Sequence, residues 1–338
     1  MNKREHNIDV LKMLAIASVI LIHFLPSQFM RDTGSYYHIR QAVPIFMLLA
    51  GYNLANSYER RGFSSMKELY KPSFLYGKVK RIIFPFLLIL VLEIAVLYIL
   101  REGSVSNARL VRFLIFRWGP GSYFVPIIIQ TTLLMPVIHR LVKWKPFLSL
   151  VLIFIASLLL EWVCVITGIP ESTYKRLVVR YIFALALGAW FALNRDRLSF
   201  KWLAPLALIS LVYITAVNYN GLVFITTFWG SQHAPAYFYT LALTALFLKG
   251  YQFSPEKAGQ GLLIKLGQAS YHIFLVQMAY FKFVPEEKIL KIMPMAEYRA
   301  ISLVVPMALG LLFFNLENAF RKRLRNRQEK MDNRSTKS

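Results

Sequence analysis

The chain of 338 residues is 57% hydrophobic and 17% charged, and its 40 Lys and Arg against 17 Asp and Glu give a formal net charge of +23. Globular proteins average roughly 25% charged residues, and the cations here lie between long apolar runs rather than on a polar face. This composition excludes a water-soluble enzyme, a nucleic-acid binder and a disordered chain. Uncharged runs of about 18 residues or more are typical of membrane spans, because they cross about 30 Å of hydrocarbon. The sequence therefore predicts an all-α, polytopic transmembrane helix bundle.

Ten segments are predicted to span the membrane. In chain order they are residues 8–25, 41–58, 82–100, 123–142, 147–168, 177–194, 202–218, 233–249, 263–283 and 299–319. Several contain Pro or Gly, which a bundle tolerates because neighbouring helices satisfy the freed backbone groups. The eighth span follows an aromatic, uncharged stretch that is broken by Gly230, so totals of eight or twelve spans are the alternatives to ten.

The distribution of Lys and Arg orients these spans. Alternate connections carry 26 cations on the side of the N-terminus and 13 on the other side, and the richer side is cytoplasmic. Both termini are therefore predicted in the cytoplasm, as an even span count requires, with the chain in a bacterial-type plasma membrane. Residues 1–320 form the predicted transmembrane domain, and residues 321–338 form a basic cytoplasmic tail that anionic membrane lipids attract.

The first predicted span holds three ionisable residues, Asp9, Lys12 and His23. Such residues are costly within a membrane and mark candidate functional sites. Lys12 and His23 are three helical turns plus about 20° apart, so both point the same way, about 16 Å apart along the axis. Asp9 lies one turn before Lys12 and can pair with it. This layout suits an anionic molecule that enters from the cytoplasm, and the structural alternative is a snorkelling lysine with a satisfied interfacial histidine.

Two further groups of charges lie at the ends of predicted spans. Lys78, Lys80 and Arg81 directly precede the third span, where cations can hold phosphate groups, although the positive-inside rule explains them without a ligand. Glu161 and Arg180 lie toward the outer ends of the fifth and sixth spans, where they can pair or contact a ligand. The sequence has no HExxH, CxxC, phosphate-loop or dinucleotide-binding motif, so it supports neither a metal site nor a permanently bound cofactor.

Four segments resemble the acyltransferase 3 family of integral membrane O-acyltransferases, and they occur in the family's order. The run from Asn7 to His23 is similar to the family's opening helix, which has an Asp, an Arg three residues on and a His eleven beyond. Residues 43–52 are similar to the second-span motif, residues 78–81 to the Arg-x-x-Arg before the third span, and residues 266–277 to the late Gly-x-x-Ser-Tyr…His helix. The resemblance covers essentially the whole chain, including the ten spans of the family's transmembrane domain.

The chain departs from the family's motifs at four positions. Lys12 and Lys78 replace Arg, which keeps the charge and loses the planar bidentate fork. Ala50 replaces a Ser, and Gln277 stands where many members have His. His23 is therefore the one imidazole that matches the family's catalytic histidine.

The resemblance implies an acyltransferase that uses acyl-CoA, usually acetyl-CoA, as a co-substrate. The acceptor it implies is a hydroxyl of an extracytoplasmic or lipid-linked glycan of the cell envelope. The layout of charges fits this reaction: Lys78, Lys80, Arg81 and Lys12 would hold the CoA phosphates. His23, Lys12 and Asp9 are the candidate catalytic residues, with His23 as general base or acyl relay and Asp9 as the residue that orients Lys12. Arg180 and Glu161 are candidate acceptor contacts or a structural pair.

Two other classes of function stay open at this point. In a transporter that exports glycan precursors or small anions, the intramembrane charges would form a proton relay, and acetyl-CoA would not be consumed. In a non-enzymatic assembly partner for glycan enzymes, Lys12 and His23 would be freely replaceable.

Overall fold

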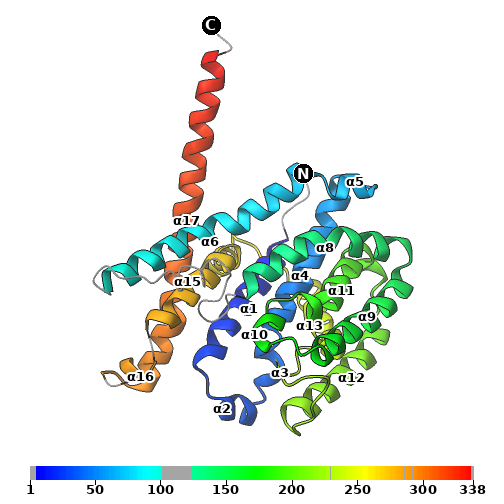
Figure 1. The fold of residues 1–338 in the computed structure, drawn as a ribbon. Helices are drawn as coiled ribbons and strands as arrows, with labels where there is room; N and C mark the ends of the chain where they lie inside the picture. The colour runs from blue at the N-terminus through cyan, green and yellow to red at the C-terminus, as the bar shows by residue number, and fades with distance from the viewer. Residues whose placement is uncertain (1–4, 101–122, 229, 285, 291, 336–338) are drawn as a thin grey trace.

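A computed structural model describes residues 5–100, 123–228, 230–284, 286–290 and 292–335 (Figure 1). The described residues form helices joined by turns and loops, in agreement with the predicted all-α class. The longer helices are α1 (His6–Phe24), α4 (Ala42–Arg60), α6 (Pro72–Leu100), α8 (Phe124–Trp144), α9 (Pro146–Ile166), α11 (Ile182–Leu193), α12 (Phe200–Asn218), α13 (Tyr237–Lys249), α14 (Gln260–Gln268), α15 (Ser270–Phe283) and α17 (Met295–Ser335). Short helices are α2 (Ser27–Asp32), α3 (Tyr36–Ile39), α5 (Met66–Leu69), α10 (Glu171–Tyr174) and α16 (Glu286–Ile289), with 3₁₀ turns η1 (Val179–Tyr181), η2 (Arg195–Arg197) and η3 (Ala234–Ala236).

Each of the ten predicted spans overlaps a helix, and the largest differences in extent are at three of them. Helix α6 begins at Pro72, ten residues before the predicted edge, and α17 continues to Ser335, so the basic tail extends the last helix. The ninth predicted span is two successive helices, α14 and α15, which meet at Ala269. The helical tail projects from the bundle in Figure 1.

Among the described residues, six helical stretches are long and apolar enough to cross a membrane. They are His6–Phe24, Met66–Ile99, Phe124–Trp144, Pro146–Ile166, Phe200–Asn218 and Met295–Arg327. The total of ten spans and the cytoplasmic termini stay predictions. Of the other predicted spans, α11 and α13 are short, and α4 carries polar residues toward its C-terminal end.

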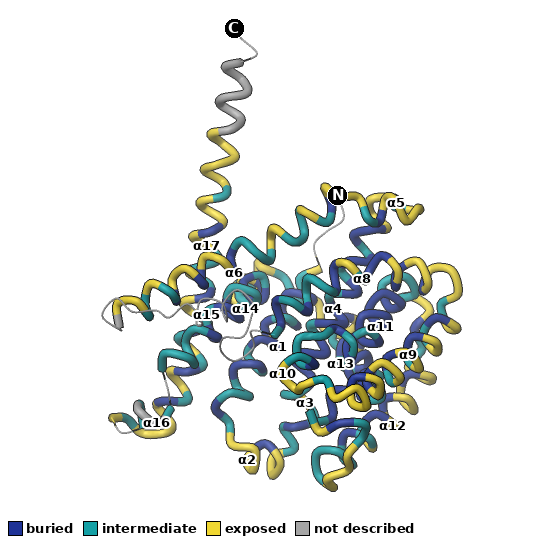
Figure 2. Tube along the Cα trace, viewed as in Figure 1, coloured by how far each residue is buried: buried dark blue, intermediate teal, exposed yellow. Residues whose placement is uncertain are grey.

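The burial pattern explains this division. Helix α9 buries a stripe that begins at Ser149 and includes Ser157 and Glu161, while its exposed side is rich in Leu, Ile and Val. An apolar exposed face is what a helix presents to lipid. Helices α4 and α11, in contrast, are buried over most of their length at the centre of the bundle (Figure 2). A helix enclosed by other helices does not need an apolar surface of its own.

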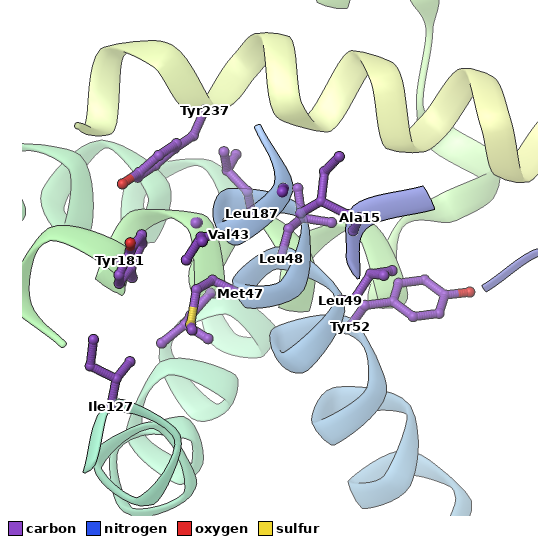
Figure 3. Close-up of a cluster of buried hydrophobic side chains, with 14 of the residues drawn as sticks. Ala15, Val43, Met47, Leu48, Leu49, Tyr52, Ile127, Tyr181, Leu187 and Tyr237 are labelled. Atoms are coloured by element: carbon purple, nitrogen blue, oxygen red, sulfur yellow. The ribbon is translucent and has the colours of Figure 1, made fainter. Parts of the chain in front are cut away.

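Helices α4 and α11 pack closely because glycines lie at their crossing. A Cβ at Gly51 would overlap the backbone of Leu185, and one at Gly188 would overlap the carbonyl oxygen of Leu48. Small residues at a crossing let two backbones approach each other in a membrane. Around this crossing the bundle buries a continuous apolar core, part of which is drawn in Figure 3 with Met47 and Leu187 among its members.

Helix α1 runs parallel to the α14–α15 pair. Gly267 lies so close to Asp9 that a Cβ there would overlap the Asp9 carbonyl oxygen. Fourteen residues further along both segments, the His23 ring lies 5.0 Å from the Phe281 ring, centroid to centroid. The equal offset keeps the two segments in register, and the late motif therefore lies beside the opening motif at one end of the bundle.

Candidate active site

A cavity of about 380 Å³, called the bundle cavity below, lies where α1, α4, α6, α8, α14 and α15 meet. Its polar lining residues are Lys12, Asn53, Arg81, Gln268, Ser270, Tyr271 and His272, and its other lining residues are Phe46, Leu49, Ala50, Ile82, Phe124, Ile128, Gly267 and Phe274. All four motif segments of the sequence contribute to this lining. Residues that are far apart in the chain therefore share one site.

Asp9 and Lys12 form the ion pair that their spacing predicts. Asp9 is 2% exposed, and its Oδ1 lies 3.7 Å from the Lys12 Nζ. Gln268 on α14 donates from Nε2 to Asp9 Oδ2 at 3.4 Å. A carboxylate held from two sides restricts the ammonium group of Lys12, which lines the bundle cavity.

A second cavity of about 530 Å³, called the mouth cavity below, is strongly basic. It is lined by Arg60, Arg61, Lys71, Lys78 and Arg81, together with Ser57, Phe63, Ser73, Phe74 and Gly77. The Arg61 guanidinium and the Lys78 ammonium each lie 5.1 Å from the centroid of the Phe74 ring. No described carboxylate forms an ion pair with these five cations. The mouth cavity is therefore suited to an anion.

Arg81 lines both cavities and joins them. Lys80, predicted beside it, lines neither cavity, and its exposed ammonium lies 5.8 Å from the Tyr76 ring on the same helix. Of the three predicted donor-site residues, Lys78 and Arg81 thus lie at a cavity and Lys80 lies outside both.

His23 lies on the same helix as Lys12, near the C-terminal end of α1, and lines neither cavity. Its half-buried ring packs against Phe281 of α15. The bundle cavity therefore lies beside the Lys12 end of α1. The His23 imidazole lies further along the same helix, where α15 runs parallel to it.

Glu161 and Arg180 are fully buried elsewhere in the bundle. Glu161 Oε2 lies 2.6 Å from Nδ1 of the buried His233, a residue to which the sequence analysis assigns no role. The Arg180 guanidinium lies 4.3 Å from the Tyr181 ring and hydrogen-bonds to the Tyr181 hydroxyl. Neither predicted residue lines the two cavities.

Sequence reasoning missed His272, whose Nε2 lies 2.6 Å from Glu317 Oε2. Two signals were present in the chain: His272 directly follows the Ser-Tyr of the late motif, and Glu317 is a lone carboxylate near the end of the last apolar run. Arg60, Arg61 and Lys71 of the mouth cavity were also missed, because the positive-inside rule explains them without a site. Within the described ranges, no three His, Cys, Asp or Glu residues gather as a metal site.

Comparison with known proteins gives one result. A family model described as an acyltransferase domain matches residues 5–316, which is nearly the whole chain and includes both cavities. No curated protein and no solved structure matches.

Proposed function

The chain belongs to this acyltransferase family, and on that premise we propose that it moves an acyl group, normally acetyl, from cytoplasmic acyl-CoA to a hydroxyl of an extracytoplasmic or lipid-linked glycan. The family match and the apolar helices make the protein a membrane acyltransferase. The donor, the acceptor, the residue roles and a bacterial plasma membrane are our proposal. The observation that carries it is the convergence of four motif segments on the bundle cavity, which shares Arg81 with the basic mouth cavity.

The mouth cavity is the proposed site for the phosphate groups of CoA. Its five cations offer charge-assisted hydrogen bonds, and its arginines offer the planar fork that suits phosphate oxygens. Volumes of about 530 and 380 Å³ lie within the usual range for small-molecule sites, roughly 300–1,000 Å³. The narrower, mainly apolar bundle cavity then accommodates the pantetheine arm, with Arg81 and Lys12 near its phosphate end. Asp9 is a positioning residue for Lys12.

The arm is proposed to continue along α1 toward His23, about 16 Å beyond Lys12 on the same helical face. There the imidazole takes the proton of the acceptor hydroxyl, whose oxygen attacks the thioester carbonyl. The carbon–sulfur bond breaks, a carbon–oxygen bond forms, and the imidazolium returns its proton to the CoA thiolate. In the alternative relay, His23 attacks the thioester carbonyl, the carbon–sulfur bond breaks, and CoA leaves as its thiol with the proton that the imidazole gives up. The acceptor oxygen then attacks the acyl-imidazole, the carbon–nitrogen bond breaks, and the hydroxyl proton returns to the imidazole. Glu161 and Arg180 are buried and paired with protein groups, which favours a structural role over acceptor contact.

The experiment that tests this function follows the acyl group itself. Membranes that contain the protein are supplied with acetyl-labelled acetyl-CoA and the native glycan fraction, and label is measured in CoA and in glycan. Transfer to the glycan supports the proposal. If acetyl-CoA is not consumed with the acceptor present, the donor proposal is wrong and the transporter alternative takes its place.

A further inference from the structure

A third cavity, called the lateral groove below, lies between α9 and α12 and has no part in the proposed function. Its volume is about 570 Å³, and residues of α11 and α13 form its floor. The floor is buried, with Leu187 1% exposed, whereas the rims are open, with Val151 56% and Trp202 79% exposed. Apart from Arg197 and Ser199, its lining side chains are aliphatic or aromatic. Both rim helices are apolar enough to cross a membrane and lie at one side of the bundle (Figure 1), so the groove opens toward lipid.

The length of the lateral groove suits an acyl chain within one leaflet. Its lining residues run from Phe147 to Phe154 on α9 and from Phe183 to Trp190 on α11, about 10 Å on each helix at 1.5 Å per residue. The hydrocarbon of one leaflet is about 15 Å thick, half of about 30 Å. At one end Phe147 packs on Trp190, with centroids 6.2 Å apart. At the other end the rings of Phe154 and Phe238 lie 5.0 and 5.3 Å from that of Phe183 and close the groove.

The Phe147 end of the lateral groove lies at the membrane interface that is predicted to be cytoplasmic. Arg195, between α11 and α12, forms an ion pair at 2.6 Å with Glu5, which directly precedes α1. Lys143, near the end of α8, forms one at 2.7 Å with Glu59 near the end of α4. Trp144, at the turn into α9, is 69% exposed, and tryptophans gather at headgroup level. This end of the groove therefore meets the lipid headgroups on the side of the mouth cavity.

Two cations lie at this end of the lateral groove. Arg197 lines it directly, and the Lys249 ammonium donates to the carbonyl oxygen of the lining residue Leu198 at 3.2 Å. Neither cation forms an ion pair with a carboxylate of the described residues, and the exposed Asp196 forms none either. Cations at headgroup level attract anionic lipids and can bind a phosphate through charge-assisted hydrogen bonds. An apolar groove with cations at its headgroup end is complementary to a lipid with an anionic head.

We propose that the lateral groove binds an anionic phospholipid, with an acyl chain against α11 and the phosphate at Arg197 and Lys249. A phospholipid fits better than a polyprenyl carrier, because the phenylalanine rings close the groove within one leaflet. A bound chain also supports the central crossing of the bundle, since Leu187 of the floor precedes Gly188, which packs on Leu48 of α4. This inference does not depend on the identity of the acyl donor or acceptor.

The test measures lipid binding to the full chain in detergent by native mass spectrometry. It compares the dissociation constant of the first bound phosphatidylglycerol with that of phosphatidylcholine, a zwitterionic lipid with the same chains. Arg197→Gln should weaken phosphatidylglycerol binding about tenfold or more, the value of one hydrogen bond to a charged group, and leave phosphatidylcholine binding unchanged. The matched control is Lys201→Gln, because Lys201 is exposed and does not line the groove. Its affinity for phosphatidylglycerol should stay within about twofold of wild type.

A second pair of variants tests the position of the acyl chain. Val151→Trp fills the lateral groove from its α9 rim and should weaken the binding of both lipids. Val163→Trp makes the same change on the same helix at an exposed position outside the groove, and it should weaken neither. If Val151→Trp does not fold, Leu206→Trp on the α12 rim replaces it with the same expected loss.

Four results would overturn the inference. They are equal affinity of wild type for the two lipids, equal losses within either matched pair, tighter binding of undecaprenyl phosphate than of phosphatidylglycerol, and a lipid-free dimer that Val151→Trp dissociates. Thermal unfolding gives an independent measure, because a ligand of the folded state raises its stability. Phosphatidylglycerol should raise the unfolding temperature of wild type and Lys201→Gln more than that of Arg197→Gln, and an equal rise in all three also overturns the inference.

Discussion

Replacement of Arg81 by Gln, compared with the same change at Lys80, tests the proposed donor site with a matched control. Both substitutions remove one positive charge from neighbouring positions of α6. Arg81 lines the mouth cavity and the bundle cavity, whereas Lys80 is exposed and lines neither. A role at the cavities therefore affects one variant and spares the other, while a general effect of net charge affects both.

The expected magnitudes follow from the two environments. A hydrogen bond to a charged group contributes about 1.5–3 kcal/mol, and 1.4 kcal/mol is tenfold in affinity, so Arg81→Gln should weaken donor binding about 10- to 100-fold. The exposed Lys80 ammonium acts on a donor in the cavities only through long-range electrostatics. Solvent ions screen this attraction, since the Debye length is about 8 Å at physiological ionic strength. The donor affinity of Lys80→Gln should stay within about twofold of wild type.

The assay measures the CoA dissociation constant and the acetyl-CoA KM for wild type and both variants in lipid nanodiscs. Thermal unfolding checks that each variant is folded. Equal losses in the two variants, or a larger loss in Lys80→Gln, would refute the assignment of the phosphates to the mouth cavity.

Three further results are expected. Gly267→Ala should destabilise the protein by about 1–3 kcal/mol, because the new Cβ overlaps the Asp9 carbonyl oxygen. The control is Gly77→Ala, whose Cβ meets no atom within 4 Å and which should be neutral or slightly stabilising in thermal unfolding. An equal loss of stability in both variants contradicts the packing argument. Lys282→Met should lower the free energy of unfolding by about 3–5 kcal/mol, because it leaves the buried Glu93 carboxylate without the ammonium group that lies 2.8 Å from it. The double variant with Glu93→Leu should recover most of this stability in thermal unfolding. The absence of recovery would contradict the ion pair's role. Raising the salt concentration from 0.1 to 1 M shortens the Debye length from about 10 to 3 Å and should weaken CoA binding in calorimetry; a salt-independent constant argues against a phosphate contact in the mouth cavity.

Much of the fold follows from the sequence because apolar run length is a strong signal in a membrane protein. All ten predicted segments are helical in the structure. The extents were less predictable where a helix leaves the apolar run, as at the start of α6, since the mixed residues 72–81 do not distinguish a continued helix from a loop. The break at Ala269 between α14 and α15 has no hydropathy signal at all.

In the site, likewise, contacts within one helix were predictable, whereas contacts that depend on how helices pack were not. The Asp9–Lys12 pair was predictable from helical spacing alone. The different positions of Lys80 and Arg81 were also within reach, because positions 78 and 81 share a helical face and position 80 does not. That inference needed α6 to begin at Pro72.

The His272–Glu317 pair could not be predicted in the same way. The two residues are 45 positions apart, and only the packing of α15 against α17 brings them together. Which side of a helix lines a cavity depends on the neighbouring helices, and a single sequence does not specify them. Likewise, the spacing of Lys12 and His23 predicts their common direction but not that the bundle cavity lies at the Lys12 end.

The most direct test of acyl transfer through His23 compares wild type with His23→Ala in membranes supplied with acetyl-labelled acetyl-CoA and the native glycan fraction. The matched control is His38→Ala, because His38 lies on α3 and lines neither cavity. Wild type and His38→Ala should transfer label to the glycan, and His23→Ala, expressed at the same level, should transfer it about 10²- to 10⁴-fold more slowly, the usual contribution of a general base. Undiminished transfer by His23→Ala would contradict the role of His23, and the absence of transfer by wild type would contradict the proposed reaction.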